Sequence, residues 1–318
     1  MPHAESNISP SEGPPQAVAV SAETEAPSNR PALEVLKDYW TMTKPEISFL
    51  VVVSALAGFL MGTPAALDGW LLLWTLLGVG LCAGGVGMLN HVIEADFDAQ
   101  MKRTMDRPLA SSRVSEPAAR TTGILMIAAG VALVCPLVNP LTAVLAVVTC
   151  VLYLLVYTPL KRETKYNTLI GTIPGALPAL GGYTAVTGTI DGVGLAAFGI
   201  LAAWQMPHFL ALAWMYRKDY DRGGYLMLPV VEPNGDSTAR QTIAFTALLL
   251  IISAVPTALG ATGWLYLIGV LPLGVWFLWT ALAFNRRRTG QSARRVLKAS
   301  IVYIPVLVAL IVADWLLL

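Results

Sequence analysis

Charged side chains are scarce in this sequence. Of its 318 residues, 13% are Asp, Glu, Lys or Arg, whereas a soluble domain has about 25%. Hydrophobic residues make up 55%, so a water-soluble enzyme and a disordered protein are both excluded. The formal net charge of +1 also excludes a nucleic-acid-binding protein with a basic face. The composition that remains is that of a polytopic membrane protein.

Cysteine is also rare, and three cysteines are too few for a disulfide-stapled secreted domain. Cys82, Cys135 and Cys150 all fall within apolar stretches and have neither CxxC spacing nor a neighbouring histidine. We interpret them as small buried apolar side chains. They predict no metal or redox site.

The N-terminal segment lacks the features of a targeting sequence. Residues 1–29 contain no Lys or Arg and are rich in Glu, Ser, Pro and Ala, unlike a secretory signal or a transit peptide. Such a segment buries too little apolar surface to offset the entropy of ordering. We expect residues 1–34 to be a disordered cytoplasmic tail and residues 35–318 to be the transmembrane domain.

Apolar stretches dominate the rest of the chain, and each approaches the length of about 20 residues that spans a bilayer as a helix. Nine are expected, at 46–64, 70–91, 121–138, 141–158, 167–187, 194–214, 241–260, 264–284 and 299–317. The predicted fold class is therefore all-α, a polytopic membrane protein. The fifth stretch contains Pro174 and Pro178 among several glycines. It is either a kinked packing helix or a helix that lines a cavity, where freed backbone groups find partners.

Basic residues are segregated along the chain. All 21 lie before the first stretch or after the second, fourth, sixth and eighth stretches, and the intervening loops have none. By the positive-inside rule, the N-terminus is expected in the cytoplasm and the C-terminus outside.

Oxygen-bearing side chains recur at the end of the second stretch. Asn90, Glu94 and Asp98 are spaced by four residues and share one face of a helix. Mg²⁺ prefers one or two carboxylates together with substrate phosphate oxygens. Three cations that suit phosphate follow at once: Lys102, Arg103 and Arg107. The pattern predicts a metal-bridged diphosphate site. The alternative is a charged helix end that merely meets water, but acids near membrane depth are costly and usually functional.

Two further groups follow apolar stretches on the same predicted side, and a histidine lies within one of these stretches. Asp219 and Asp221 follow the sixth stretch and are candidates to complete the metal site. His208 lies in the apolar run before them, where a lone histidine is more often a packing residue than a ligand. Lys161 and Arg162 follow the fourth stretch, and alone they indicate topology.

With these segments in view, the sequence resembles the UbiA-type intramembrane prenyltransferases. Asn90, Glu94 and Asp98 match the first motif of that family, Asn-x3-Asp-x3-Asp, with Glu in the middle place. Three further segments resemble, in this order, the branch that farnesylates haem: Met101-x-Arg103-Thr104-x-x-Arg107-Pro108-Leu109, Tyr157-Thr158-Pro159-Leu160-Lys161-Arg162, and Gln205-Met206-Pro207-His208 followed by Asp219-Tyr220. The resemblance covers residues 35–318.

Two positions depart from the family pattern. The longer side chain of Glu94 leaves open that Asp96 shares the metal. The second motif of many members is Asp-x3-Asp, but the fourth residue after Asp219 is Gly223. We therefore keep Asp219 in the expected site and give Asp221 less weight.

The resemblance implies a function and a site. It implies a central cavity in which Mg²⁺ is held by four residues: Asn90, Glu94, Asp98 and Asp219. It implies that five basic residues bind the diphosphate of farnesyl diphosphate: Lys102, Arg103, Arg107, Lys161 and Arg162. A vinyl group of haem B, held near His208, would accept the farnesyl group with addition of water, giving haem O for haem A and terminal oxidase biogenesis.

The same resemblance implies a bacterial plasma (inner) membrane location, and it leaves other assignments open. A downstream haem-modifying membrane enzyme is a candidate partner, and no nucleic acid is expected. A quinone precursor or a chlorin is an alternative acceptor. A secondary transporter is an alternative from another class. Transporters commonly show internal repeats and ionisable groups at the bilayer midplane, whereas the basic residues here all lie on one predicted side of the membrane.

Overall fold

The computed structural model describes residues 30–63 and 66–317. Residues 1–29, where most of the expected tail lies, are outside this range. Helix α1 (Ala32–Met42) begins before residue 35, so the expected boundary of the tail falls inside a helix. Within the described residues the regular structure is helical, without strands.

Nine helical segments of the described chain are long and apolar enough to cross a membrane, which confirms the expected number. They are α2 (Pro45–Gly62), α3 (Gly69–Asp98), α4 (Glu116–Leu137), α5 (Pro140–Val151) continued by the π-helix η1 (Leu152–Tyr157) and α6 (Thr158–Leu160), α7 (Asn167–Thr187), α8 (Gly192–Met215), α11 (Asp236–Ile252) with α12 (Val255–Ala258), α13 (Trp264–Arg287) and α14 (Gly290–Trp315). Two short helices, α9 (Arg217–Arg222) and α10 (Leu228–Val231), connect α8 to α11.

Several helices run further than their apolar stretches. α3 continues to Asp98 instead of residue 91, and α14 begins at Gly290 instead of residue 299. Apolarity marks the part in the membrane, but helical hydrogen bonds continue into the charged segments. At the start of α14, the side chains of Thr289 and Ser292 form a capping box, which satisfies backbone N–H groups of the first turn.

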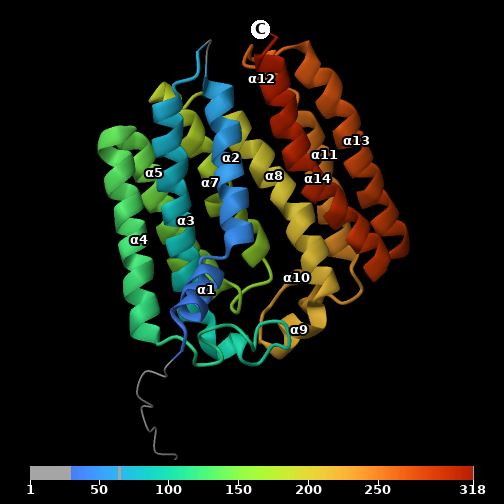
Figure 1. Cartoon of the computed structure of the whole chain (residues 1–318). Helices are drawn as coiled ribbons and strands as arrows, with labels where there is room; N and C mark the ends of the chain where they lie inside the picture. Colours follow the sequence, from blue (N-terminus) through green and yellow to red (C-terminus); the bar gives the residue numbers. More distant parts are fainter. Residues whose placement is uncertain (1–29, 64–65, 318) are drawn as a thin grey trace, which may run out of the picture.

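The helices form two groups around a central set. α2 packs on α7, and α7 packs on α8. α3, α4 and α5 lie on one side of this set, and α11, α13 and α14 lie on the other (Figure 1). The α2–α7 crossing is close because glycines allow it: a Cβ on Gly182 would lie 1.8 Å from the Ala55 carbonyl oxygen, and one on Gly58 would lie 1.8 Å from the Ala179 carbonyl oxygen. This places α7, with its two internal prolines, deep in the bundle.

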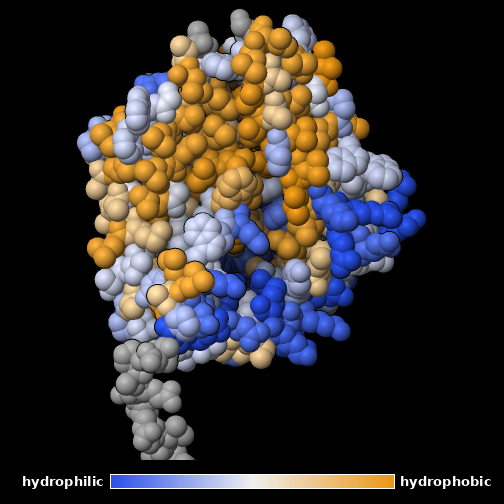
Figure 2. Space-filling view, viewed as in Figure 1, coloured by the Kyte–Doolittle hydropathy of each residue, from blue (hydrophilic) through white to orange (hydrophobic). Residues whose placement is uncertain are grey.

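The outer surface divides into an apolar part and a charged end (Figure 2). The charged end carries α1, the α3–α4 loop (residues 99–115) and α9 (Figure 1). The apolar part exposes large side chains such as Leu155 and Ile268, as expected where lipid is the solvent. Cys82 and Cys150 are buried, but Cys135 is exposed. The expectation of burial was wrong for Cys135 because a small apolar side chain can face lipid as well as protein.

Candidate active site

An apolar cavity of about 260 Å³ lies between α2, α3, α5–η1, α7 and α8. Its wall includes Pro174 and Pro178 of α7, so the fifth apolar stretch is both a packing helix and a cavity-lining one. Lys44, Tyr153 and Tyr157 line the cavity toward the charged end. Figure 2 shows a recess where the apolar surface meets the charged end.

The oxygen-bearing side chains of α3 lie together on one face. Asn90, Glu94 and Asp98 are 0%, 6% and 1% exposed. Asp96 is exposed on another face of the helix. The geometry therefore favours Glu94 over Asp96 as the residue that faces the site.

A cation from a different segment contacts each member of this set. Lys161 Nζ lies 2.7 Å from Glu94 Oε1. Arg107 Nη1 lies 2.6 Å from Asp98 Oδ2. Lys44 Nζ donates a hydrogen bond to Asn90 Oδ1, and Asn90 Nδ2 donates to Thr158 Oγ1 at 3.2 Å. Opposite charges thus meet in a buried cluster, where screening by solvent is weak.

Lys44 is a site residue that the sequence did not single out. In the sequence it is one of the basic residues that indicate the topology. Its backbone adopts the left-handed region with φ 50°, at the N-cap of α2 before Pro45. This conformation is uncommon for a residue with a Cβ, and it turns the chain from α1 into α2. A basic residue directly before the proline that opens a membrane span was the only available signal.

The two lysines of the cluster differ electrostatically. Burial lowers the pKa of Lys44 to about 7, although nearby Glu94 opposes this shift. Burial also disfavours the charged form of Lys161, but the adjacent Glu94 carboxylate raises its pKa well above the usual value. Lys161 is therefore held as a cation by its partner.

The π-helix η1 brings two aromatic rings to this end of the cavity. The rings of Tyr153 and Tyr157 meet edge to face with centroids 5.2 Å apart. Lys161 Nζ lies 4.8 Å from the centroid of Tyr157. Wide π-helical turns occur often at functional sites, and nothing in the apolar run of residues 152–157 indicated one.

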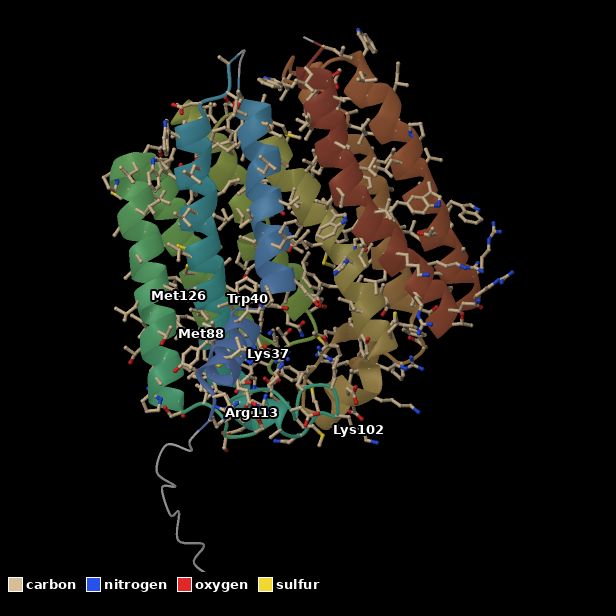
Figure 3. The ribbon with its side chains drawn as sticks, viewed as in Figure 1. Lys37, Trp40, Met88, Lys102, Arg113 and Met126 are labelled. Carbon is tan, nitrogen blue, oxygen red and sulfur yellow. The ribbon has the colours of Figure 1, made fainter. Side chains whose placement is uncertain are left out.

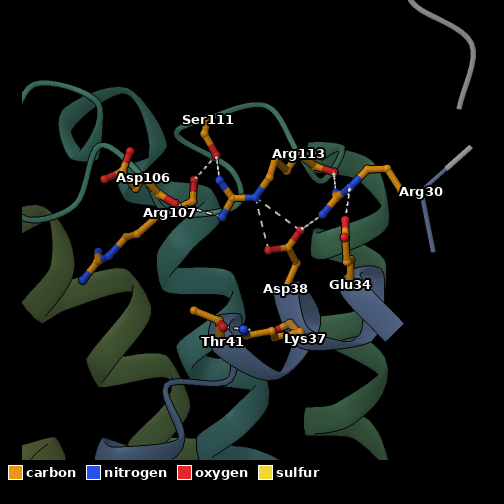
Figure 4. Close-up of polar contacts among 9 residues, drawn as sticks. All are labelled: Arg30, Glu34, Lys37, Asp38, Thr41, Asp106, Arg107, Ser111 and Arg113. Atoms are coloured by element: carbon orange, nitrogen blue, oxygen red, sulfur yellow. Dashed lines mark hydrogen bonds and ion pairs between the residues drawn. The ribbon is translucent and has the colours of Figure 1, made fainter. Parts of the chain in front are cut away.

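The α3–α4 loop is fastened at both ends. Thr104 Oγ1 donates to the Asp98 carbonyl oxygen at 2.9 Å. Arg113 contacts Asp38 of α1, with 3.2 Å between Arg113 Nε and Asp38 Oδ1, and donates to the Asp106 carbonyl oxygen at 2.9 Å (Figure 4). Asp38 also pairs with Arg30 at 2.6 Å. α1 therefore holds the loop that presents Arg107 to Asp98.

Three of the expected diphosphate-binding residues lie at the surface. Lys102, Arg103 and Arg162 are exposed, and Figure 3 shows Lys102 at the lower end of the molecule. The Arg103 guanidinium lies over the rings of Tyr216 and Tyr220, at 5.5 and 5.8 Å from their centroids. The Arg162 guanidinium lies 3.7 Å from the centroid of Phe97. Only Arg107 and Lys161 of the expected five contact the buried acids.

The second acidic segment lies apart from the first set. Asp219 is half-buried on α9 and pairs with Arg222 at 3.2 Å, and Asp221 is exposed. Across residues 30–63 and 66–317, no group of three or more His, Cys, Asp and Glu side chains is close enough to hold one metal ion. The structure brings Asn90, Glu94 and Asp98 together, but it does not assemble Asp219 with Glu94 and Asp98 into such a group.

One atom of the first set fits a hard cation. Asp98 Oδ1 is buried and has no hydrogen-bond partner, which is unusual for a buried carboxylate oxygen. Mg²⁺ takes such oxygens as ligands. The donors on this face of α3 therefore suit a magnesium ion.

His208 lies on α8 in the wall of the cavity and is half-buried. Its Nδ1 atom lies 2.9 Å from Ser300 Oγ of α14. This hydrogen bond is to a serine and not to one of the acids of the charged cluster. A molecule in the cavity would meet this imidazole.

The sequence is similar to proteins of known family. The UbiA prenyltransferase family matches residues 51–304. A protoheme IX farnesyltransferase of Salinibacter ruber is 64% identical over 281 residues, which cover 88% of this chain and 99% of that protein. A second, from Opitutus terrae, is 41% identical over 278 residues, which cover 87% of this chain and 94% of that protein.

Solved structures share the fold. A structure of digeranylgeranylglyceryl phosphate synthase matches with a TM-score of 0.73 and 17% identity over 90% of this chain and all of that one. A UbiA homologue from Archaeoglobus fulgidus bound to DMAPP and Mg²⁺ matches with a TM-score of 0.66 and 17% identity over 88% of this chain and all of that one. These similarities confirm the expected all-α membrane fold, and the chain belongs to the UbiA prenyltransferase family.

Proposed function

We propose that this chain transfers the farnesyl group of farnesyl diphosphate to a vinyl group of haem B, giving haem O and diphosphate. The observation that carries the proposal is an apolar cavity that meets a buried cluster of cations and carboxylates at one end. The 64% identity to a protein named protoheme IX farnesyltransferase supports haem as the acceptor. A transporter finds no support in these similarities, because the matching family consists of prenyltransferases.

The buried cations are the proposed diphosphate site. Lys44, Arg107 and Lys161 converge on the α3 face from three segments. A diphosphate competes with Glu94 and Asp98 for these cations, because its phosphate oxygens accept the same charge-assisted hydrogen bonds. The fixed positive charges then stabilise the charge that develops on the leaving group. Exposed Lys102, Arg103 and Arg162 raise the local concentration of the anion.

Carboxylate oxygens released from their cations are the proposed ligands for Mg²⁺. Asp98, whose Oδ1 has no partner, would hold the ion with Asn90 and Glu94, and Asp219 is the expected fourth ligand. When bound, the ion neutralises charge on the leaving diphosphate. We expect the diphosphate and the ion to bind at this face interdependently, so that each strengthens the binding of the other.

The apolar cavity is the proposed site of the farnesyl chain and the reacting carbons. The bond between C1 of farnesyl and the diphosphate oxygen breaks, and the allylic cation forms a new bond to a haem vinyl carbon. The positive charge passes to the other vinyl carbon, where the oxygen of a water molecule adds, and loss of one proton from that water completes the hydroxyethylfarnesyl group. The π faces of Tyr153 and Tyr157 attract a cation, and the apolar wall excludes bulk water that would trap it early.

We also propose a plasma-membrane location with the charged end in the cytoplasm, as the positive-inside rule indicates. The product carries a farnesyl chain that haem B lacks, and it would therefore reach a downstream haem-modifying membrane enzyme without leaving the bilayer.

The decisive experiment supplies the purified protein with farnesyl diphosphate, haem B and Mg²⁺ and identifies the product by mass. We expect haem O and diphosphate in equal amounts, and neither without Mg²⁺. Parallel reactions contain a quinone precursor or a chlorin in place of haem. Prenylation of one of these, with haem B unreacted, would overturn the assignment of haem B as the acceptor, but the assignment of prenyl transfer would stand.

A further inference from the structure

His208 is held against α14 by contacts to a single residue. Its Nδ1 lies 2.9 Å from Ser300 Oγ. Trp204, one turn earlier on α8, donates its Nε1–H to the Ser300 carbonyl oxygen at 2.8 Å. The Trp204 ring stacks on the imidazole with centroids 5.1 Å apart, and Phe209 meets its edge at 5.3 Å. The imidazole therefore has a fixed orientation in the cavity wall.

The hydrogen bonds of Ser300 determine which nitrogen of His208 carries the proton. Ser300 is fully buried, and its Oγ lies 2.7 Å from the Leu297 carbonyl oxygen. A carbonyl only accepts, and a serine hydroxyl has one hydrogen to donate. With that hydrogen on Leu297, Ser300 Oγ accepts from His208 Nδ1–H. Only this assignment satisfies both contacts, and it leaves the lone pair of a neutral imidazole on Nε2.

His208 Nε2 remains available to a molecule in the cavity. Among the described residues, no protein group forms a hydrogen bond with Nε2. Nε2 is not among the fully buried atoms of the protein interior, and the side chain lines the cavity while half-buried. The Nε2 lone pair is thus at the cavity surface rather than sealed in the packing.

We propose that Ser300 is a positioning residue that fixes His208 as the Nδ1–H tautomer and presents Nε2 to the iron of the haem substrate. The proposal rests on the proposed function, because haem iron is the acceptor of the lone pair. A metal-bound histidine almost always donates its other N–H to an oxygen, and loss of such a partner commonly weakens metal binding 10- to 100-fold, about the effect expected here. A histidine that served only for packing would not require the proton to be on one particular nitrogen.

The first measurement uses the protein without haem. The chain has three histidines, His3, His91 and His208, so ¹⁵N-histidine labelling gives few signals. Single substitutions of His3 and His91 assign them. We expect His208 to carry its proton on Nδ1 in the wild-type protein and on Nε2 to a large extent in Ser300→Ala. A wild-type His208 protonated on Nε2 would overturn the inference, and this readout depends neither on haem nor on the folding of Ser300→Ala.

The second measurement titrates ferric haem into the same proteins and follows the Soret absorption. We expect a histidine-ligated spectrum that His208→Ala loses, a roughly tenfold weaker affinity in Ser300→Ala, and recovery in Ser300→Thr. Tyr303→Phe is the matched control, because it removes a buried hydroxyl of α14 that bonds Ser253 and not His208. If Ser300→Ala matched wild type in haem affinity and spectrum while His208→Ala lost haem binding, the role of Ser300 would be refuted and the contact between His208 and iron would stand. A haem spectrum unaffected by His208→Ala would refute the iron contact itself, and the role of Ser300 with it.

Discussion

The two acidic segments that the sequence marked as metal ligands lie in very different surroundings. On α3, Glu94 and Asp98 are buried, and they pair with Lys161 from a distant segment and with Arg107 from the loop after α3. On α9, Asp219 pairs with Arg222 three residues away, near the solvent. An ion pair in the first setting is costly to break because its removal leaves a buried charge, whereas an exposed pair contributes about 1 kcal/mol or less.

We infer from this difference that the two segments act at different stages of the proposed reaction. The charges of the α3 set are balanced by Lys161 and Arg107 without a bound substrate. The acid of the α9 segment is balanced only by Arg222 on the same short helix, and the segment lies beside the α3–α4 loop, where Arg103 contacts Tyr216 and Tyr220. We infer that α3 provides the core of the site and that α9 contributes once substrate is bound.

The largest effect is expected from Glu94→Gln, which keeps the shape and removes the charge. Loss of one preorganised electrostatic group in an enzyme typically costs about 10²- to 10³-fold in kcat, and here Lys161 also loses its carboxylate partner. Diphosphate release from farnesyl diphosphate in the presence of haem measures the effect, and Glu94→Asp is expected to retain more activity. Asp96→Asn is the matched control, because Asp96 is exposed on the same helix. Full activity in Glu94→Gln would refute the proposed metal site.

An intermediate effect is expected from Asp219→Asn. Because Asp219 is half-buried and its partner is exposed, the thermal stability should not change measurably. We expect about a tenfold higher Mg²⁺ concentration for half-maximal activity, in line with the loss of one metal ligand interaction. Asp221→Asn, on the same short helix, serves as the control. A loss of kcat in Asp219→Asn as large as that in Glu94→Gln would show that the two acidic segments do not differ in importance.

The contrast also shows what the sequence could and could not predict. The shared face of Asn90, Glu94 and Asp98 follows from helical spacing, which is local. Arg107 is near Asp98 in sequence, but the other two cations that contact this face are not local: Lys161 is 67 positions from Glu94, and Lys44 is 46 positions from Asn90. Only packing of α2, α3 and η1 brings them together. The burial of one acidic segment and exposure of the other had no sequence signal, because both follow apolar stretches.

A smaller effect is expected from Asp38→Asn, which weakens the hold of α1 on the α3–α4 loop. Burial raises the pKa of Asp38, but hydrogen bonds from Arg30 and Arg113 outweigh it, and the net shift is downward from 3.8. A lowered carboxyl pKa stabilises the fold above the ordinary pKa, and this stability is lost as pH falls through the folded pKa. We expect wild-type α1 to become protease-sensitive only below about pH 4.

In Asp38→Asn, the same sensitivity should be present at neutral pH, with kcat lowered a few-fold because Arg107 is held less firmly against Asp98. Limited proteolysis across a pH series, followed by mass analysis of the cut sites, measures it. Glu34→Gln is the control on the same helix, because Glu34 is exposed and contacts Arg30 only at 3.7 Å. Protection of α1 in Asp38→Asn at pH 7 equal to wild type would show that other contacts dock the helix.

The smallest effect is expected from Lys102→Gln, at the solvent-exposed edge of the site. Lys102 is exposed and, unlike Arg107, is not paired with a buried acid. In the proposed site its charge would act on the diphosphate through solvent, where salt screens interactions over about 8–10 Å near physiological ionic strength. We expect KM for farnesyl diphosphate to rise about two- to threefold at low salt, from weaker electrostatic steering, and the difference from wild type to vanish at high salt. Arg107→Gln should instead lower kcat at every salt concentration, because Arg107 lies against Asp98 in the buried cluster. A large, salt-independent loss in Lys102→Gln would place Lys102 on the diphosphate itself and move the boundary between the buried and exposed parts of the site.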